Sequence, residues 1–477
     1  MLATHITNHR KHRIHGKFSF GFSSVYSVYS VVSPRACSII QALNELFDLR
    51  IRGSDNFVAN LQDSYNVTIR SEKSVRRHSN ILHITLADFI LRAGYQMGKT
   101  PLLPLLAASL GATDVLLGMI VSVSTLTGML TKPIFGVLSD RQGRKLWIVL
   151  GTLLFAGVPF LYRFIDTPGQ LVLLRLLHGT ATAIFGPVTV AYVAERSGRR
   201  KAERLGWFGM ARSGGYVVGP LAAGMLLLWN DPADVFAVIG GLSLLAFIPV
   251  FLLDETADGG PQTAIRNSQL AIRPPFRIPT SPFRTPAVWL SGGMEATVYI
   301  ATYAIKAFLP VYALTAGYNT AQIGLFFTVQ EGVHLLLKPA AGRAGDRLGY
   351  YWAIALGMGG LAGLLPLLTV ASAGWMLLGL AGLFGACQAL IFPATVALVA
   401  DQIEPAHLGA GLGFVGTLDN AGKVVGPVLG GLLVAGLGYA GMLWLLAGLL
   451  LTGALVVATV LPKMRVGSPR AVVSGGE

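Results

Sequence analysis

Long apolar segments alternate with short polar ones from about residue 84 to residue 461. Each apolar segment holds roughly 20 residues, enough for an α-helix to cross a hydrocarbon core of about 30 Å. We predict six spans in the first half, at 84–108, 114–137, 146–164, 169–196, 203–228 and 234–253. Six more follow in the second half, at 287–313, 320–342, 351–371, 373–402, 407–434 and 438–461. The pattern predicts an all-α membrane protein with 12 transmembrane helices.

A segment between two of these spans occurs twice. Residues 131–145 return as residues 337–351, so that one set of side chains recurs at a constant shift: Lys132, Pro133, Gly136, Asp140, Arg141 and Gly143 become Lys338, Pro339, Gly342, Asp346, Arg347 and Gly349. Pro104, Gly111 and Pro187 have counterparts at the same shift in Pro310, Gly317 and Pro393. Such a register predicts two pseudo-symmetric six-helix bundles, as in many secondary transporters.

The bundles predict a division of the chain into five parts. Residues 81–253 and 287–461 form the bundles, 254–286 a polar, proline-rich linker, and 462–477 a tail. Residues 1–80 form a basic extension, rich in serine and histidine, without an acidic residue before Glu45. Three interpretations of this extension remain open: a disordered tail or misassigned start, a targeting peptide, and a small regulatory segment. We therefore assign it no function.

Composition excludes several classes of protein. Hydrophobic residues make up 53% of the 477 residues, charged residues only 13%, and the mean hydropathy is +0.60, which is too apolar for a soluble chain of this length. The net charge of +14 could indicate a nucleic-acid partner. However, the basic residues gather in alternate loops, in the linker and in the tail, as the positive-inside rule describes. We therefore expect a multi-pass protein of the cell (inner or plasma) membrane, with both termini cytoplasmic and no nucleic-acid partner.

Enzymatic and cofactor-dependent functions find little support. The chain has no G-x4-G-K-[S/T] loop that would bind ATP phosphates, and its histidines and two cysteines lack metal-ligand spacing. We expect no enzyme activity, no metal and no cofactor. An ion gradient, most simply of protons, is then the energy source.

The repeated segment resembles the loop motif of the major facilitator superfamily (MFS), and the resemblance extends over 84–461. The family pattern G-x-L-a-D-r-x-G-r-k is matched by Gly136, Leu138, Asp140, Arg141, Gly143, Arg144 and Lys145. The resemblance implies a cytoplasmic gate in which Asp140 meets a helix N-terminus or arginines in one conformation only. Its second copy supplies Gly342, Asp346, Arg347 and Gly349. A turn with topogenic positive charge is the alternative.

Two further motifs of that family lie within spans. Span 4 resembles l-x3-R-x2-q-G through Leu171, Arg175, His178 and Gly179, with histidine in place of the usual glutamine. In proton-coupled relatives this arginine is implicated in proton relay, which the resemblance extends to Arg175; an arginine that braces a neighbouring helix is the alternative. Span 5 resembles the antiporter motif g-x8-G-x3-G-P-x2-G-G, and span 11 repeats it: Gly206, Gly215, Gly219, Pro220 and Gly224, then Gly413, Gly422, Gly426, Pro427, Gly430 and Gly431. This resemblance implies drug:proton antiport, whereas tight helix packing is the plainer reading.

Ionisable and aromatic residues inside the spans predict an inward-facing polar path, since charges exposed to lipid are costly. The candidates for a substrate and proton path are Asp88, Arg92, Gln96, Lys99, Arg175, His178, Arg212, Glu295, Tyr299, Tyr303, Lys306, Glu331, His334, Asp419 and Lys423. Asp88 with Arg92, and Asp419 with Lys423, have the i,i+4 spacing of an intrahelical ion pair. Glu295, Glu331 and Asp419 are the candidate proton carriers, because the proton affinity of an acid depends on its burial and on nearby cations. Static ion pairs between helices are the alternative for any one of them.

These features favour a secondary active transporter that exports a drug or metabolite by alternating access, coupled to protons and acting as a monomer. The alternative is an uptake or exchange carrier for an organic anion, because Arg92, Lys99 and Lys306 put cations on spans 1 and 7. A non-transporting membrane sensor on the same scaffold is a remote third possibility.

Overall fold

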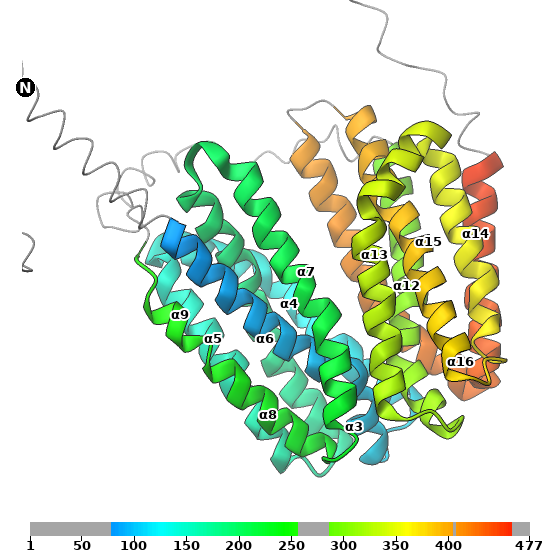
Figure 1. The fold of residues 1–477 in the computed structure, drawn as a ribbon, viewed down its shortest axis with the longest axis horizontal. Coiled ribbons are helices and arrows are strands. Elements are labelled where there is room, and N and C mark those ends of the chain that lie inside the picture. Colours follow the sequence, from blue (N-terminus) through cyan, green and yellow to red (C-terminus); the bar gives the residue numbers. More distant parts are fainter. Residues whose placement is uncertain (1–77, 256–285, 404–406, 460–477) are drawn as a thin grey trace, which may run out of the picture. The chain divides into compact units, whose positions relative to one another are not determined.

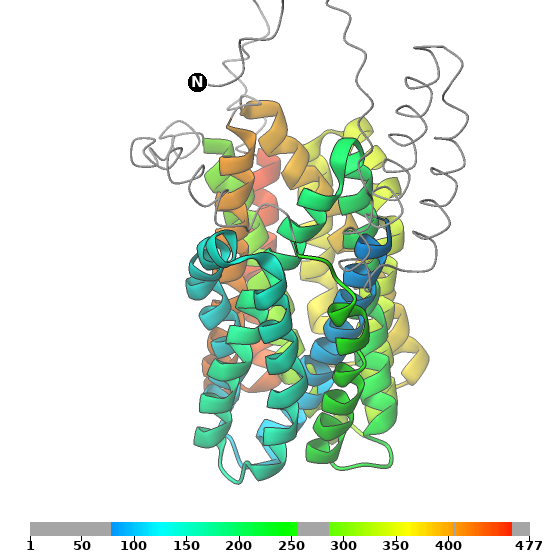
Figure 2. The same cartoon turned by 90° about the vertical axis from the view of Figure 1, so that its left-hand side faces the viewer.

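The structure is a computed structural model and describes residues 78–255, 286–403 and 407–459. The predicted extension up to residue 77, most of the linker and the tail lie outside these residues. Within them the chain is helical, and its helices form two bundles (Figures 1 and 2). We refer to residues 78–255 as the N-terminal bundle and to residues 286–459 as the C-terminal bundle.

The N-terminal bundle supplies the first six spans. Span 1 runs through a helix at 78–97, η1 (Gly98–Leu102) and α3 (Leu103–Ser109). The others are α4 (Asp114–Gln142), α5 (Arg144–Leu161) with η2 (Tyr162–Phe164), α6 (Pro168–Arg196), and, after η3 (Gly198–Arg200), α7 (Lys201–Leu226) and α8 (Pro232–Leu244) with α9 (Phe247–Phe251).

The C-terminal bundle repeats this order. Its helices are α12 (Pro286–Thr315), α13 (Thr320–Leu348), α14 (Tyr350–Leu367), α15 (Gly374–Gln402) and α16 (Leu408–Thr459). Gly438 adopts φ 72° inside α16, so this element contains the last two predicted spans on either side of a kink. The twelve-span prediction is confirmed.

Local sequence explains where the helices begin and end. Thr167 and Asn319 form capping boxes with Gln170 and Gln322, which satisfy free N–H groups at the starts of α6 and α13. The repeated loop motif differs from the expectation, because it stays helical for most of its length. α4 continues to Gln142 and α13 to Leu348, and each stops only at a glycine with positive φ, Gly143 at 94° and Gly349 at 89°.

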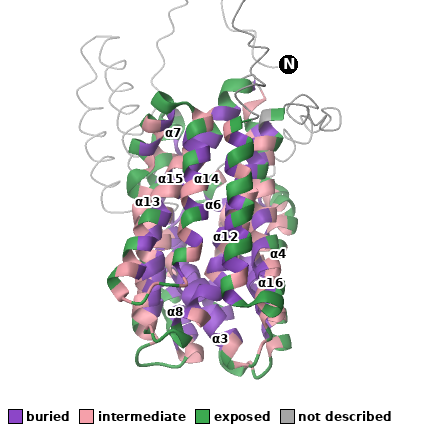
Figure 3. Ribbon diagram, turned by 90° about the vertical axis from the view of Figure 1, so that its right-hand side faces the viewer, coloured by how far each residue is buried: buried purple, intermediate pink, exposed green. Residues whose placement is uncertain are grey.

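The surface is consistent with a lipid environment. Large apolar side chains such as Leu130, Leu336, Trp375 and Trp444 are more than 60% exposed, and Figure 3 shows exposed residues along the outward sides of the helices. Eight described helices are long and apolar enough to cross a membrane. Span 1, α7 and α13 are not among them, because they carry the charged side chains described below.

Close backbone contacts join the two bundles toward one end. α4 packs on α16 and α7 packs on α13, and Figure 1 shows α7 and α13 converging toward the end where α3 lies. A Cβ atom at Gly118 would lie 2.1 Å from the Pro427 carbonyl oxygen, and one at Gly324 would lie 2.3 Å from that of Pro220. These positions lie away from the ends of α4 and α13 that carry the loop motif. We call the end of the bundles with the loop motif the motif end, and the end with these glycine contacts the opposite end.

Candidate functional site

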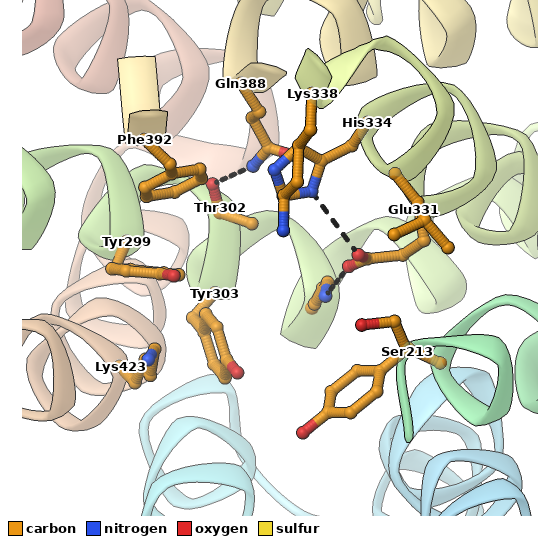
Figure 4. Close-up of a pocket in the computed structure, with 13 residues that line it drawn as sticks. Ser213, Tyr299, Thr302, Tyr303, Glu331, His334, Lys338, Gln388, Phe392 and Lys423 are labelled. Carbon is orange, nitrogen blue, oxygen red and sulfur yellow. Dashed lines mark hydrogen bonds and ion pairs between the residues drawn. The ribbon is translucent and has the colours of Figure 1, made fainter. Parts of the chain in front are cut away.

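A cavity of about 220 Å³ lies where α7 meets the C-terminal bundle. Its lining is rich in tyrosine, lysine and polar side chains from α7, α12, α13, α15 and α16 (Figure 4): Ser213, Tyr216, Tyr299, Thr302, Tyr303, Lys306, Glu331, His334, Leu335, Lys338, Gln388, Phe392 and Lys423. Five predicted path residues of α12 and α13, and Lys423 of α16, meet here. The cavity therefore brings together most of the candidates from the second half.

An ion pair between helices forms part of the cavity wall. Nζ of Lys306 on α12 donates to Oε1 of Glu331 on α13 at 2.7 Å. Nδ1 of His334 lies 3.8 Å from Oε2 of the same carboxylate, one helical turn along. Glu331 thus has a basic group at each oxygen, which compensates for its removal from water.

Aromatic rings face the other lysines. The Lys423 ammonium lies 3.9 Å from the centroid of the Tyr299 ring, a cation–π contact. Although both residues are described, Asp419 and Lys423 form no ion pair within 4.0 Å, contrary to the pairing that their spacing allows. Lys99 of span 1 lies over Tyr303 at 4.8 Å and reaches Oγ1 of Thr125 at 3.4 Å. Lys99 therefore approaches the cavity wall, as does Arg92 of the same span, which interacts with Tyr216.

Glu295 of α12 does not line the cavity. It is 4% exposed and accepts a hydrogen bond from the Thr395 hydroxyl of α15. Its carboxyl group also interacts with that of Asp419 on α16. Two carboxyl groups that interact in this way can share one proton.

A second buried ion pair holds the N-terminal bundle together. Arg212 of α7 donates from Nε and Nη2 to the two carboxylate oxygens of Asp88, at 2.9 and 2.6 Å. Arg92, the partner expected from i,i+4 spacing, is 3.9 Å away. Thr189 of α6 donates to the same carboxylate at 3.4 Å. The bidentate geometry makes Arg212 the principal partner of Asp88.

Arg175 lies in a network of hydroxyl groups. Although its side chain is fully buried, it contacts no carboxylate within 4.0 Å among the residues described. Its guanidinium donates to Oγ of Ser124 at 2.5 Å and to the Tyr162 hydroxyl at 3.3 Å. The Tyr162 hydroxyl lies 3.1 Å from Nδ1 of His178, and the Tyr95 hydroxyl lies 3.4 Å from Ser124. The motif arginine and histidine thus belong to one interior network rather than to the lipid-facing surface.

The first copy of the loop motif connects three helices of its own bundle. Arg144 pairs with Asp140 and donates to Oε1 of Glu195 on α6 at 3.0 and 2.8 Å. Glu255, at the start of the linker, accepts from the backbone N–H of Lys145 at 3.3 Å. Asp140 remains 58% exposed. In this conformation its ion pair therefore lies inside the motif.

The second copy of the motif differs from the first. Asp346 and Arg347 are exposed, and neither joins an ion pair within 4.0 Å in the part of the chain that the structure describes. The two copies share a backbone turn, and only the first carries a network of charges.

The glycines of the antiporter-type motif make two kinds of contact. Within each bundle they pack on the first helix: a Cβ at Gly215 or Gly219 would lie 2.9 Å from the Ala93 backbone, and one at Gly422 or Gly426 would lie 2.5 Å from a carbonyl oxygen of α12. The last glycine of each copy instead contacts the other bundle. A Cβ there would lie 2.4 Å from Thr320 O at Gly224, and 2.5 Å from Asp114 O at Gly431.

Several site residues are not among the candidates predicted from the sequence. They are neutral polar side chains on otherwise apolar helices: Ser124, Tyr162, Thr189, Thr302, Gln330, Gln388 and Thr395. Gln388 illustrates them, since it accepts from Gln330 at 2.9 Å and donates to Thr302 at 3.0 Å. The available signal was an amide at membrane depth, which requires hydrogen-bond partners from other helices.

Comparison with known proteins agrees with this architecture. A multidrug resistance protein MdtG from Proteus mirabilis is 25% identical over 389 residues, which cover 77% of this chain and 92% of that protein. MdtG of Salmonella arizonae is 24% identical over 83% of this chain and 99% of that protein. An uncharacterised MFS-type transporter of Methanocaldococcus jannaschii is 24% identical over 76% and 92%.

Solved structures with low sequence identity share the fold. A variant of the nucleoside transporter NupG aligns with a TM-score of 0.61 and 13% identity, over 80% of this chain and 99% of that one. A variant of the peptide transporter POT, in complex with sulfate, aligns with a TM-score of 0.62 and 15% identity, over 80% and 94%. The model of the Major Facilitator Superfamily matches residues 85–329 and again 293–475. The chain belongs to this superfamily of membrane transporters.

Proposed function

We propose that the protein exports small organic molecules by alternating access, in exchange for protons. The observation that carries this proposal is the position of the ionisable cavity between bundles whose close backbone contacts, among the described residues, lie toward one end. Tilting one bundle against the other would break these contacts and open the cavity at the opposite end. The described conformation would be the one that is open toward the motif end.

Export is supported by the relatives. The MdtG proteins are multidrug resistance proteins by name, and they align with this chain over nearly their whole length. The glycine motifs of α7 and α16 supply the close contacts that such a movement must make and break. We place the motif end, both termini and the linker in the cytoplasm of a cell that carries the protein in its plasma membrane.

The proton carriers in this proposal are Glu331, Glu295 and Asp419. Glu331 is held between Lys306 and His334, and movement of α13 against α12 would change that environment. Glu295 and Asp419 join α12 to α16 and can share a proton. An acid whose surroundings change with conformation changes its proton affinity, and this couples proton transfer to the movement of the bundles. The monomer needs no cofactor for such a cycle.

Proteoliposomes test the proposal directly. Purified protein is reconstituted with a pH-sensitive dye inside, and compounds from a cationic, neutral and anionic panel are added together with a proton gradient. We expect substrate-dependent proton flux opposite in direction to substrate flux, and loss of coupling in at least one of Glu295→Gln, Glu331→Gln and Asp419→Asn. Full coupling in all three variants would show that the proton is carried elsewhere.

A further inference from the structure

The cavity contains more positive than negative side chains. Its lining includes three lysines, Lys306, Lys338 and Lys423, but a single carboxylate, Glu331. The Lys306 ammonium and the Glu331 carboxylate neutralise each other at 2.7 Å. Two lysines therefore remain without a carboxylate on the cavity wall.

The two remaining lysines have no direct ionic partner. Among the described residues, neither Lys338 nor Lys423 forms an ion pair within 4.0 Å. Lys423 lies over the Tyr299 ring, and Figure 4 shows the end of the Lys338 side chain directed toward the middle of the group of residues drawn. Lys99 adds a third ammonium nearby, over Tyr303. A positive charge at membrane depth without a direct ion pair is costly, and a bound anion would offset that cost.

The acids closest to these lysines do not cancel the excess. Glu295 and Asp419 interact with each other, and Glu295 accepts a hydrogen bond from Thr395. Neither residue lines the cavity. A shared proton on this pair would leave it with one negative charge.

The rest of the lining suits an aromatic or apolar body. Tyr216, Tyr299, Tyr303 and Phe392 present ring surfaces, and Tyr299 stacks on Phe392 with centroids 5.0 Å apart. The volume of about 220 Å³ is small, so a compact molecule fits better than a large drug. Charge and shape thus point to a small molecule with both a ring and an anionic group.

We propose that the substrate is an organic anion: a carboxylate, phosphonate, phosphate or sulfonate on a small aromatic or apolar body, bound through Lys338 and Lys423. This inference rests on the proposed transport function, but not on its direction. The lysines hold the anionic group, and the tyrosine and phenylalanine rings pack on the body. Lys306 contributes little to anion binding, because Glu331 already neutralises it.

Binding measured without any gradient tests this inference separately from transport. The full chain is placed in phosphatidylcholine nanodiscs, and intrinsic fluorescence titrations compare phenylacetate, 2-phenylacetamide and 2-phenylethylammonium, which share one aromatic body but differ in charge. We expect phenylacetate to bind best. Lys338→Gln should weaken its binding by about tenfold or more, the size of a lost hydrogen bond to a charged group, while leaving 2-phenylacetamide within about twofold.

Two control variants separate a local site from a general field. Lys338→Arg keeps the charge and should retain most of the preference for the anion. Lys132 is the repeat counterpart of Lys338 and does not line the cavity. Lys132→Gln should therefore weaken phenylacetate binding much less than Lys338→Gln does. Equal losses in Lys132→Gln and Lys338→Gln, or equal or weaker binding of phenylacetate than of the other two probes, would overturn the proposal.

A lipid is the other source of an anionic group. Nanodiscs with phosphatidylglycerol distinguish it: if this lipid abolishes phenylacetate binding, the lysines hold a lipid head group and the proposal of a soluble substrate fails. If the anion binds as expected but proteoliposomes show no substrate-linked proton flux, the substrate class stands and the proposed coupling fails. If only cations were transported together with proton flux, the proposed coupling would stand and the proposed substrate class would fail.

Discussion

The contacts at the opposite end predict that two glycines control how completely the bundles close. Gly224 of α7 and Gly431 of α16 occupy equivalent places in the two copies of the antiporter-type motif. Each lies against the backbone of the other bundle, Gly224 at Thr320 and Gly431 at Asp114. We expect Gly224→Ala with Gly431→Ala to destabilise this closure and to shift the population toward the conformation that is open at the opposite end.

The size of the effect follows from the distances. The added methyl groups would lie 2.4 and 2.5 Å from carbonyl oxygens, whereas a relaxed carbon–oxygen contact needs about 3.3 Å or more. Each helix pair must therefore separate by nearly 1 Å. Overpacking of this kind costs about 1–3 kcal/mol per site. The two contacts involve different helix pairs and share no residue, so we expect their costs to add. The double variant should shift the equilibrium between conformations by roughly 30-fold or more, because 1.4 kcal/mol corresponds to a factor of ten.

Distances between spin labels can report this shift. Asp231 follows α7 and Thr315 ends α12, so that the two exposed positions lie at the opposite end on different bundles. Cysteines are introduced there after Cys37 and Cys387 have been replaced by alanine, and electron double resonance gives the distance distribution. We expect a longer distance to predominate in the double variant, together with a fall in transport.

A matched control uses the same two helices. Gly209 and Gly416 are also equivalent in the two copies, and a Cβ at either would meet nothing within 4 Å. Gly209→Ala with Gly416→Ala changes helix propensity as the test variant does, but should leave the distance distribution as it is in the parent. If both double variants behaved alike, backbone contact at Gly224 and Gly431 could not be what closes this end.

Two further substitutions test the charge networks. Arg212→Met should lower the free energy of unfolding by about 3–5 kcal/mol, because it leaves Asp88 buried with Arg92 3.9 Å away. Thermal unfolding in detergent measures this loss, and the explanation fails if the double variant Arg212→Met/Asp88→Asn recovers none of it. Arg144→Gln should cost only about 1 kcal/mol, since its network is partly exposed, yet it should reduce transport strongly if the motif acts in the conformational cycle; a melting temperature that fell as steeply as in Arg212→Met would instead make Arg144 chiefly structural.

The twelve spans and their duplication could be predicted because they depend on patterns along the chain. A membrane-spanning helix needs a run of apolar residues, and a repeat appears as a constant shift between landmarks. The secondary structure of the loop-motif residues is harder to predict from the sequence. The apolar pattern predicts that the span ends at residue 137, whereas the helix continues to Gln142 and ends at Gly143, which has a positive φ.

The pairing of charges could be predicted only in part. That these residues face inward follows from the cost of a charge in lipid, and the structure does place Asp88, Lys306, Glu331 and Lys423 inside. Their partners depend on which helices become neighbours. Spacing along one helix favoured Arg92 for Asp88, but Arg212 reaches the same carboxylate with two hydrogen bonds from α7. Residue spacing within one helix cannot predict a contact between two helices.

The two kinds of contact made by the antiporter-type motif explain why the motif occurs in both bundles. Its earlier glycines pack α7 on span 1 and α16 on α12, and its last glycine packs each helix on the other bundle. Closure at the opposite end is therefore pseudo-symmetric, and one copy alone would leave half of the interface unmade. This contact geometry serves export and uptake equally well, so the motif does not set the direction of transport. In the proposed cycle, the direction instead depends on how the affinities for substrate and for protons differ between the two conformations.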